Sequence, residues 1–218
     1  SMYRIAKTGT VPIILGGDHL ITCALISGYQ QAMAESGQGR IGYLRFSSQL
    51  DLGQEDPILG TVWRGTTARR ILDDHTVRAT NMVWVGTNGY IPKDQVDLAQ
   101  ELDLKIHTLK EVVNKGIEAV TLQALEEASE GCDAIYASID MDVIDGVYIH
   151  SMSVPSFQGL KNVELQVAMN TLAQGPVKAL DMVGCNPITD YIGQGQVASN
   201  FASAMVFHFM MPRFTEST

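Results

Sequence analysis

Two carboxylates lie two residues apart at the end of an apolar run in the middle of the chain. The run spans residues 134–139, and Asp140 and Asp142 come directly after it. A short apolar run is typical of a buried strand, and side chains at positions i and i+2 of a strand share one face. We expect both carboxylates to converge on one point, where a proton or a divalent cation would relieve their repulsion. Taken alone, such a pair could also cap loops or form ion pairs.

A histidine follows a second apolar run, near the start of the chain. Residues 11–15 read VPIIL, two glycines interrupt the run, and Asp18 and His19 come next. His19 could ligate a metal ion, or it could bond the backbone at the start of a helix. Asp18 is expected to cap that helix.

Together, GGDH at residues 16–19 and SIDMDVID at residues 138–145 resemble the ureohydrolase family of arginases, agmatinases, guanidinobutyrases and formimidoylglutamases, and the agmatinase-like branch fits best. Three further segments resemble the family's signatures in the family's order: RGTTARR at 64–70, SVPSFQGL at 153–160 and NPITD at 186–190. The resemblance covers the chain from Val11 onward. It implies hydrolysis of a linear amidine or guanidino C–N bond at a centre of two manganese ions.

The resemblance also implies which residues would hold the metal. His19, Asp51, Asp140 and Asp142 match four of the family's six ligands. The other two have changed, because Ser47 stands in place of the metal-bridging Asp and Gln49 in place of the second His. We expect no dinuclear centre, and either no metal or one divalent ion, Mn first, held by His19, Asp51 and Asp140.

The positions that would contact substrate have changed too. Arg64 replaces a His that the resemblance places beside the substrate, and Gly184 replaces a Glu expected to face the guanidinium. A guanidinium stays protonated and cannot shuttle protons. No catalytic residue is assigned, and Arg64 and Asn186 are the candidate substrate-binding residues.

These changes favour a family homologue that is catalytically impaired or inactive, acting as a binding or assembly subunit. The alternative is a divergent hydrolase with a single or altered metal centre, acting on a guanidino or carboxylated ligand that uses Arg64. A gene product without a retained role is a third, weaker reading. In a site without metal, Asp51, Asp140 and Asp142 should have raised pKa values, unless Arg45 or Arg64 neutralises them.

Composition restricts the classes of function. The chain has 218 residues, 15 basic and 24 acidic, with a net charge of -9, which argues against a nucleic-acid surface. The sequence has no apolar run of about 18 residues that would cross a membrane, and no signal peptide is recognised. The three scattered cysteines fit neither a disulfide framework nor a zinc site, so a reduced, cytoplasmic setting is expected.

Alternating strand and helix patterns predict a three-layer α/β/α arginase-like fold with a mostly parallel sheet of about six strands. Residues 11–218 form one domain, and residues 1–10 are a tail or an expression remnant. The predicted strands are 11–15, 41–46, 82–87, 105–109, 134–140 and 177–183, and the predicted helices are 19–34, 66–74, 93–102, 117–129, 162–173 and 197–210.

The strand at residues 11–15 has an unusual expected position. The resemblance implies that a preceding strand unit, missing here, would lie beside it, so in this chain the strand becomes an apolar edge. Proteins cover or pair such edges. Residues 3–10 could fold over it, another chain could pair with it, or the sequence could be a fragment. We expect a homo-oligomer, with no nucleic-acid or membrane partner.

Overall fold

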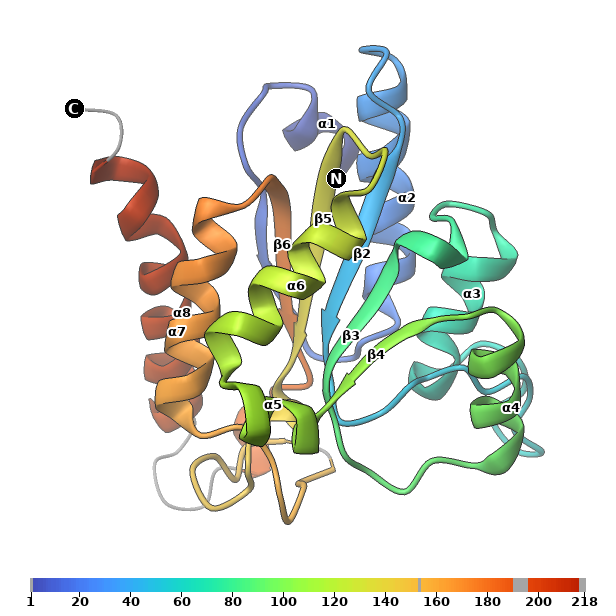
Figure 1. The fold of residues 1–218 in the computed structure, drawn as a ribbon, viewed down its shortest axis with the longest axis vertical. Helices are drawn as coiled ribbons and strands as arrows, with labels where there is room; N and C mark the ends of the chain where they lie inside the picture. Colours follow the sequence, from blue (N-terminus) through green and yellow to red (C-terminus); the bar gives the residue numbers. More distant parts are fainter. Residues whose placement is uncertain (1, 153, 190–195, 216–218) are drawn as a thin grey trace.

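Six strands form one sheet in which every neighbouring pair is parallel (Figure 1). The computed structural model describes residues 2–152, 154–189 and 196–215. The strand order β1-β6-β5-β2-β3-β4 confirms the predicted parallel sheet and places β1 at one edge. The strands are β1 (Ile13–Leu15), β2 (Ile41–Phe46), β3 (Met82–Thr87), β4 (Lys105–Thr108), β5 (Ala134–Asp140) and β6 (Val177–Val183).

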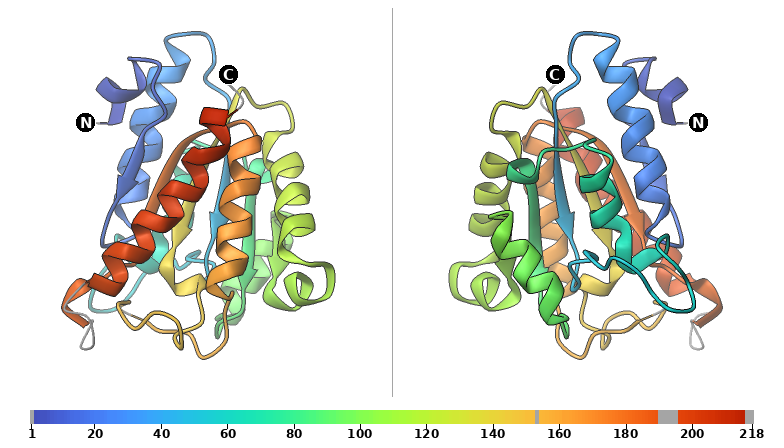
Figure 2. Two further views of the ribbon diagram at one scale, coloured as in Figure 1. Left: turned by 90° about the vertical axis from the view of Figure 1, so that its left-hand side faces the viewer. Right: turned by 90° about the vertical axis from the view of Figure 1, so that its right-hand side faces the viewer.

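Helices cover both faces of this sheet, which confirms the three-layer prediction (Figure 2). One apolar cluster packs α5–α8 against the sheet, and a second packs α1–α4 against the opposite face. The helices are α1 (Met2–Ala6), α2 (Ile21–Ala34), α3 (Thr67–Asp73), α4 (Lys93–Glu101), α5 (Leu109–Lys115), α6 (Ile117–Ser129), α7 (Asn162–Gln174) and α8 (Gln196–Thr215).

The central strands carry apolar side chains on both faces because helices lie on both sides of them. Every residue of β2, β3 and β5 is buried. Arg45 departs from this apolar pattern within β2. Its charged side chain is buried between the layers, at 0% exposure. A buried guanidinium needs anionic or acceptor partners, and those partners lie at the end of the same strand.

Two helices had not been predicted. Helix α5 begins at Leu109, where the sequence analysis had continued a strand, and the Thr108 side chain accepts a hydrogen bond from Glu111 N at its start. Helix α1 falls in the segment expected to be a tail, and Met2 is buried there at 5% exposure. Helix α2 begins at Ile21 rather than His19, and Asp18 accepts a hydrogen bond from Leu20 N just before it.

Strand β1 remains partly exposed at its edge of the sheet. It pairs with β6 on one side only, and Leu15 is 59% exposed. Helix α1 packs on α2 instead of along β1, because Tyr3 and Lys7 both bond Glu35 beyond the end of α2. Among the residues that the structure describes, no helix is long and apolar enough to cross a membrane.

Candidate functional site

The predicted site residues gather at the carboxyl ends of four neighbouring strands. His19 follows β1, residues 47–51 follow β2, Asp140 ends β5 and Gly184 follows β6. In parallel sheets these strand ends meet at one edge, which is where ligands bind. A cleft of about 540 Å³ opens there. His19, Gln49, Asp51, Arg64, Asp140, Asp142, Gly184 and Asn186 all line it.

Three of the four predicted metal ligands form a compact group. Ligand atoms of His19, Asp51 and Asp140 all lie within 4.8 Å of one another. His19 Nδ1 is 2.7 Å from Asp140 Oδ2 and 3.7 Å from Asp51 Oδ2. One imidazole and two carboxylates are a donor set that suits a divalent transition metal.

Asp142 lies apart from this group. It sits in the 3₁₀ helix η3 (Met141–Val143), not on the strand, so the i, i+2 argument for a shared face fails. Its carboxylate accepts hydrogen bonds from Ser48 N at 3.0 Å and Ser48 Oγ at 2.8 Å. Asp140 caps η3 by accepting from Asp142 N at 3.0 Å. The two carboxylates therefore turn towards different partners.

The guanidinium of Arg45 reaches the group of His19, Asp51 and Asp140 from strand β2. Arg45 Nη2 donates to Asp51 Oδ2 in a short ion pair, to Ser47 Oγ at 3.1 Å, and lies 3.2 Å from His19 Nδ1. Arg45 and Ser47 are i, i+2 neighbours, so both face the site. Of the two arginines that the sequence analysis considered for neutralising the carboxylates, Arg45 is the one that pairs with Asp51.

A chain of buried side chains holds His19 from the other side of its ring. His19 Nε2 lies 3.0 Å from Ser138 Oγ, and Ser138 donates to Asp181 Oδ1 at 2.6 Å. Asp181 also accepts from Thr22 and Tyr136. The sequence analysis missed Asp181, although one Asp within the apolar run 177–183 is the kind of buried polar residue that needs such partners.

These contacts determine the form of the His19 ring. Burial, followed by the Arg45 charge, lowers the pKa of His19 to about 4, so the ring is neutral at pH 7. The Ser138 proton is used on Asp181, so Nε2 must donate to Ser138. The Nδ1 lone pair then faces Arg45 and Asp140. The short contact with Asp140 requires a proton on that carboxyl, and burial raises the Asp140 pKa.

Burial is the main cause of the raised carboxyl pKa values of Asp140 and Asp142. It raises the pKa of Asp142 to about 7, and the neighbouring Asp140 charge adds to the shift. The predicted cause, mutual repulsion, is therefore second to desolvation at Asp142. Asp51 has a φ of +51°, in the left-handed region that is rare for non-glycine residues. Such backbone strain is more frequent at functional sites.

The replaced positions show how the cleft differs from the implied family pattern. Gly184 has a φ of +79°, and a Cβ there would lie 2.2 Å from Asp140 Oδ1, so any side chain would displace that carboxylate. The Gln49 amide packs against Gly89. Arg64 begins the 3₁₀ helix η1 (Arg64–Thr66), is exposed in the cleft, and lowers the Asp140 pKa against the effect of burial.

Asn186 contributes mainly to loop structure. Its Oδ1 accepts from Ile188 N at 3.2 Å, and its backbone N donates to Ser151 O. Asp190, the last residue of the NPITD segment, lies outside the described residues, as does Ser153 of the segment at 153–160.

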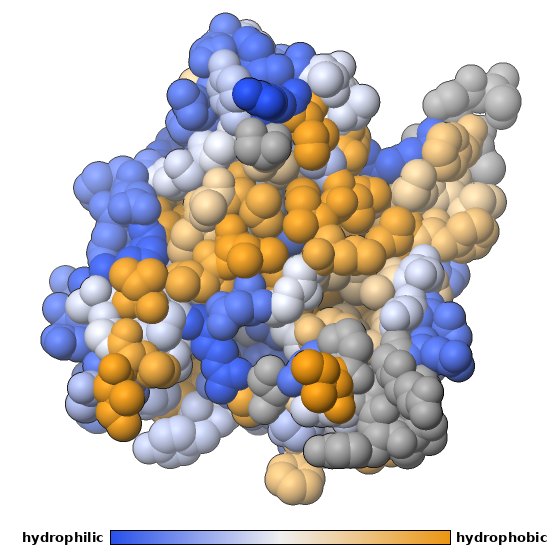
Figure 3. Space-filling model, turned by 180° about the vertical axis from the view of Figure 1, so that it is seen from behind, coloured by the Kyte–Doolittle hydropathy of each residue, from blue (hydrophilic) through white to orange (hydrophobic). Residues whose placement is uncertain are grey.

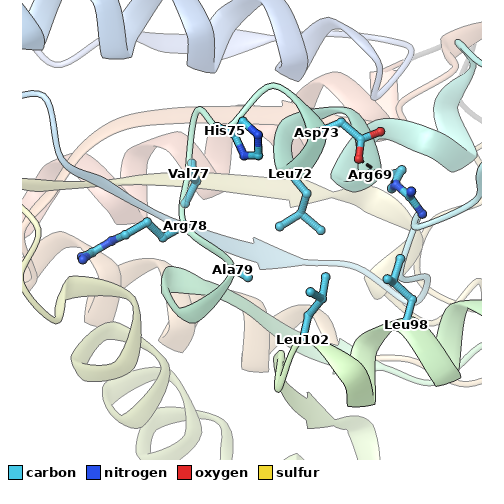
Figure 4. Close-up of a pocket in the computed structure, with 9 residues that line it drawn as sticks. All are labelled: Arg69, Leu72, Asp73, His75, Val77, Arg78, Ala79, Leu98 and Leu102. Atoms are coloured by element: carbon cyan, nitrogen blue, oxygen red, sulfur yellow. Dashed lines mark hydrogen bonds and ion pairs between the residues drawn. The ribbon is translucent and has the colours of Figure 1, made fainter.

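A second hollow, of about 350 Å³, shares no lining residue with the cleft (Figure 4). Leu72, Val77, Leu98 and Leu102 give it an apolar wall. Arg69 is paired with Asp73 at its rim. The hollow brings no acid, base and nucleophile together, so the cleft is the candidate site.

Helices on both faces of a parallel sheet, with the candidate site at the carboxyl ends of its strands, define a three-layer α/β/α architecture. The chain matches the arginase family over residues 1–211 and belongs to that family.

Individual relatives agree with this assignment. Formimidoylglutamase of Halalkalibacterium halodurans is 25% identical over 211 residues, which are 94% of this chain and 62% of the relative. The structure of Bacillus subtilis formimidoylglutamase superposes with a TM-score of 0.83 at 23% identity, over 96% of this chain and 65% of that one. Trypanosoma cruzi formiminoglutamase, solved with Mn²⁺, gives a TM-score of 0.80 at 20% identity, over 95% of this chain and 68% of that one. The chain spans less than two thirds of the length of the first two.

Proposed function

We propose that this arginase-family chain has lost hydrolytic activity and acts as a binding or assembly subunit. One observation carries the proposal: the four metal-ligand and substrate-contact positions that depart from the family's motifs meet in one cleft or directly beneath it. Gln49, Arg64 and Gly184 line the cleft, and Ser47 lies under it, 3.5 Å from Asp142. Changes scattered over a surface would carry no such meaning, whereas these fall together where the reaction would occur.

Each change removes a function that the others cannot supply. A serine hydroxyl at position 47 carries no negative charge to hold two cations together. Arg64 places a fixed positive charge where a guanidinium would bind, so like charges would repel. Position 184 offers no carboxylate, and its positive φ strains any side chain placed there. Residues that act as a unit lose activity together, so partial compensation does not restore the rate.

Hydrolase assays test this proposal directly. Purified chain should release no urea from agmatine, arginine or 4-guanidinobutyrate, and should not consume N-formimidoylglutamate, with or without added Mn²⁺. The variants Ser47→Asp and Gln49→His should each remain inactive, because one restored ligand does not rebuild the unit. Urea release by the unmodified chain at a rate comparable to an arginase-family enzyme would refute the proposal.

The second candidate is a divergent hydrolase or binding protein for a carboxylated ligand. Its support is Arg64, which is exposed in the cleft and forms no ion pair within the described residues. A free guanidinium beside a pocket suits a carboxylate partner, which it can bind through two hydrogen bonds. Calorimetry with glutamate and 4-guanidinobutyrate would favour this candidate if binding appears and disappears in Arg64→Gln.

A further inference from the structure

Arg45 has contacts that set it apart from a buried arginine in an ordinary ion pair. Within the described residues, its Nε and Nη1 have no hydrogen-bond partner, although both are buried. One nitrogen, Nη2, carries the contacts with Asp51, Ser47 and His19. Leaving buried donors unsatisfied is costly. The side chain is therefore positioned to place a single cationic nitrogen among these three groups.

That nitrogen lies against two of the three groups that would hold a metal ion. Of the three members of the compact group, it bonds Asp51 and lies beside His19 Nδ1, which in turn is 2.7 Å from Asp140. The His19 lone pair faces it because Nε2 is held by Ser138. An imidazole fixed by a partner on its far nitrogen is the arrangement that supports metal ligation. Here the same lone pair meets an arginine.

Ser47 makes this arrangement possible. Its short side chain leaves the space beside Arg45 free, and its hydroxyl accepts a hydrogen bond from Nη2. The residue change that removes a bridging ligand thus also gives the arginine an acceptor. Arg45 lies in β2, and Ser47 follows directly after the strand ends at Phe46.

We propose that the Arg45 guanidinium is the resident cation of this site and excludes a divalent metal from His19, Asp51 and Asp140. A guanidinium remains charged at every accessible pH. A divalent ion within about 4 Å of it would experience strong repulsion in a buried setting. The present side chains therefore do not fit a metal centre while Arg45 keeps this position. The inference stands on the contacts of Arg45 and not on the absence of hydrolysis.

Metal binding by charge-altered variants tests the inference. Arg45→Met removes the charge and keeps an apolar stem, Arg45→Lys keeps the charge, and Arg64→Met removes the arginine that lines the cleft, as a matched control. Each protein is incubated with excess Mn²⁺ or Zn²⁺, desalted, and assayed for metal by elemental analysis and for its melting temperature. The unmodified chain, Arg45→Lys and Arg64→Met should retain little metal. Arg45→Met should retain about one ion per chain, with a melting temperature raised by about 5 °C or more in excess metal.

The gain must depend on the proposed ligands. Adding Asp140→Asn to Arg45→Met should abolish both the retained metal and the shift in melting temperature. If Arg45→Met folds only in the presence of metal, that dependence also supports the inference. If it does not fold at all, Ser47→Asp decides: with Arg45 still in place, excess metal should leave the melting temperature of this variant unchanged, whereas a rise in excess metal that EDTA abolishes would overturn the inference.

Two other results would overturn it. One is stoichiometric metal on the unmodified chain that His19→Gln removes. The other is a folded Arg45→Met that binds no metal at any concentration tested. An inactive chain that binds metal at His19 would refute this inference and leave the proposed function standing. An active chain without metal would do the reverse.

Discussion

At the residue scale, the site combines many acids with few cations. Asp51, Asp140, Asp142 and Asp181 all lie around the base of the cleft, and Arg45 is the fully buried cation among them. Arg45 reaches Asp51, while hydroxyl and backbone amide donors serve Asp181 and Asp142. Hydrogen bonds substitute for counter-charges where the arginine does not reach.

Asp142 provides the pH prediction. Its pKa is about 7 in the folded chain, raised first by burial and then by Asp140, and is near 4 when unfolded. Between these values the folded state holds a proton that the unfolded state has lost, so this group lowers the free energy of unfolding as pH rises. Asp142→Asn keeps an oxygen for Ser48 and removes the titration. Relative to the unmodified chain, it should gain stability from pH 4 to 7 and level off above.

Urea denaturation at several pH values measures this difference. Because a tenfold change in proton affinity corresponds to about 1.4 kcal/mol, the gain at pH 8 should reach a few kcal/mol. His19 acts in the opposite direction between about pH 4 and 6.5, since its pKa is lowered on folding. Comparing the two proteins at each pH removes most of the His19 contribution. A difference that does not vary with pH would contradict the prediction.

The sequence could predict which residues meet here better than how they bond. The family resemblance predicted that His19, Asp51 and Asp140 lie together, and their positions at or after strand ends agree with it, because parallel strand ends converge. The bonding partner of Asp142 depended on whether the backbone continued as a strand after Asp140, and it turned into η3. Arg45 could be assigned to the site face from its spacing with Ser47. Neither its contact with Asp51 nor the positive φ of Asp51 was indicated by a sequence pattern.

At the scale of elements, β2 passes close beneath α6. A Cβ at Gly42 would lie 2.0 Å from the Ala128 carbonyl oxygen. Backbone atoms cannot move aside as a flexible side chain can, so Gly42→Ala must push α6 away from the sheet. We expect a loss of about 1–3 kcal/mol in the free energy of unfolding, measured by urea denaturation.

Gly28→Ala is the matched control, since it adds the same methyl group inside α2. Its Cβ would lie 3.4 Å from Tyr3 N, an ordinary contact. Alanine is favoured over glycine in a helix by about 1 kcal/mol. This variant should therefore be as stable as the unmodified chain or slightly more stable. Equal stability of both variants would show that the α6–β2 contact can relax freely.

Elements were predictable where apolar periodicity was strong. All six predicted strands are present, and the pattern was clearest for β2, β3, β5 and β6, which are buried along most of their length and mainly apolar on both faces. Helix α5 was missed because the apolar Leu109 was read as the end of a strand. A Thr at 108 followed by a Glu at 111 has the spacing of a capping box, and the Thr108 cap is present. Reading that signal would have placed the helix start correctly.

At the scale of the whole molecule, one face remains apolar. Val11 and Leu15 near the β1 edge are exposed, as are Phe207, Met211 and Phe214 on α8. Figure 3 looks onto the side of the molecule that carries β1 and α2, and shows a broad apolar area that continues towards α8. Exposed apolar areas of this kind mark interaction surfaces. The unpaired backbone of an edge strand adds hydrogen-bonding capacity to the same surface.

We propose that a second copy of this chain covers that face, with two-fold symmetry as the common closed arrangement. A three-residue strand alone would bury too little area, since a stable interface needs more than about 1,000 Å², so α2 or α8 must contribute.

Light scattering should give twice the 23.7 kDa chain mass, or a multiple of it. Leu15→Lys should shift the protein towards monomer, because it puts a charge in the contact. Val113→Lys, at a 72% exposed position on α5, next to β4 at the opposite sheet edge, should leave the assembly unchanged. A monodisperse monomer at micromolar concentration, or an equal effect of both variants, would exclude this surface as the contact.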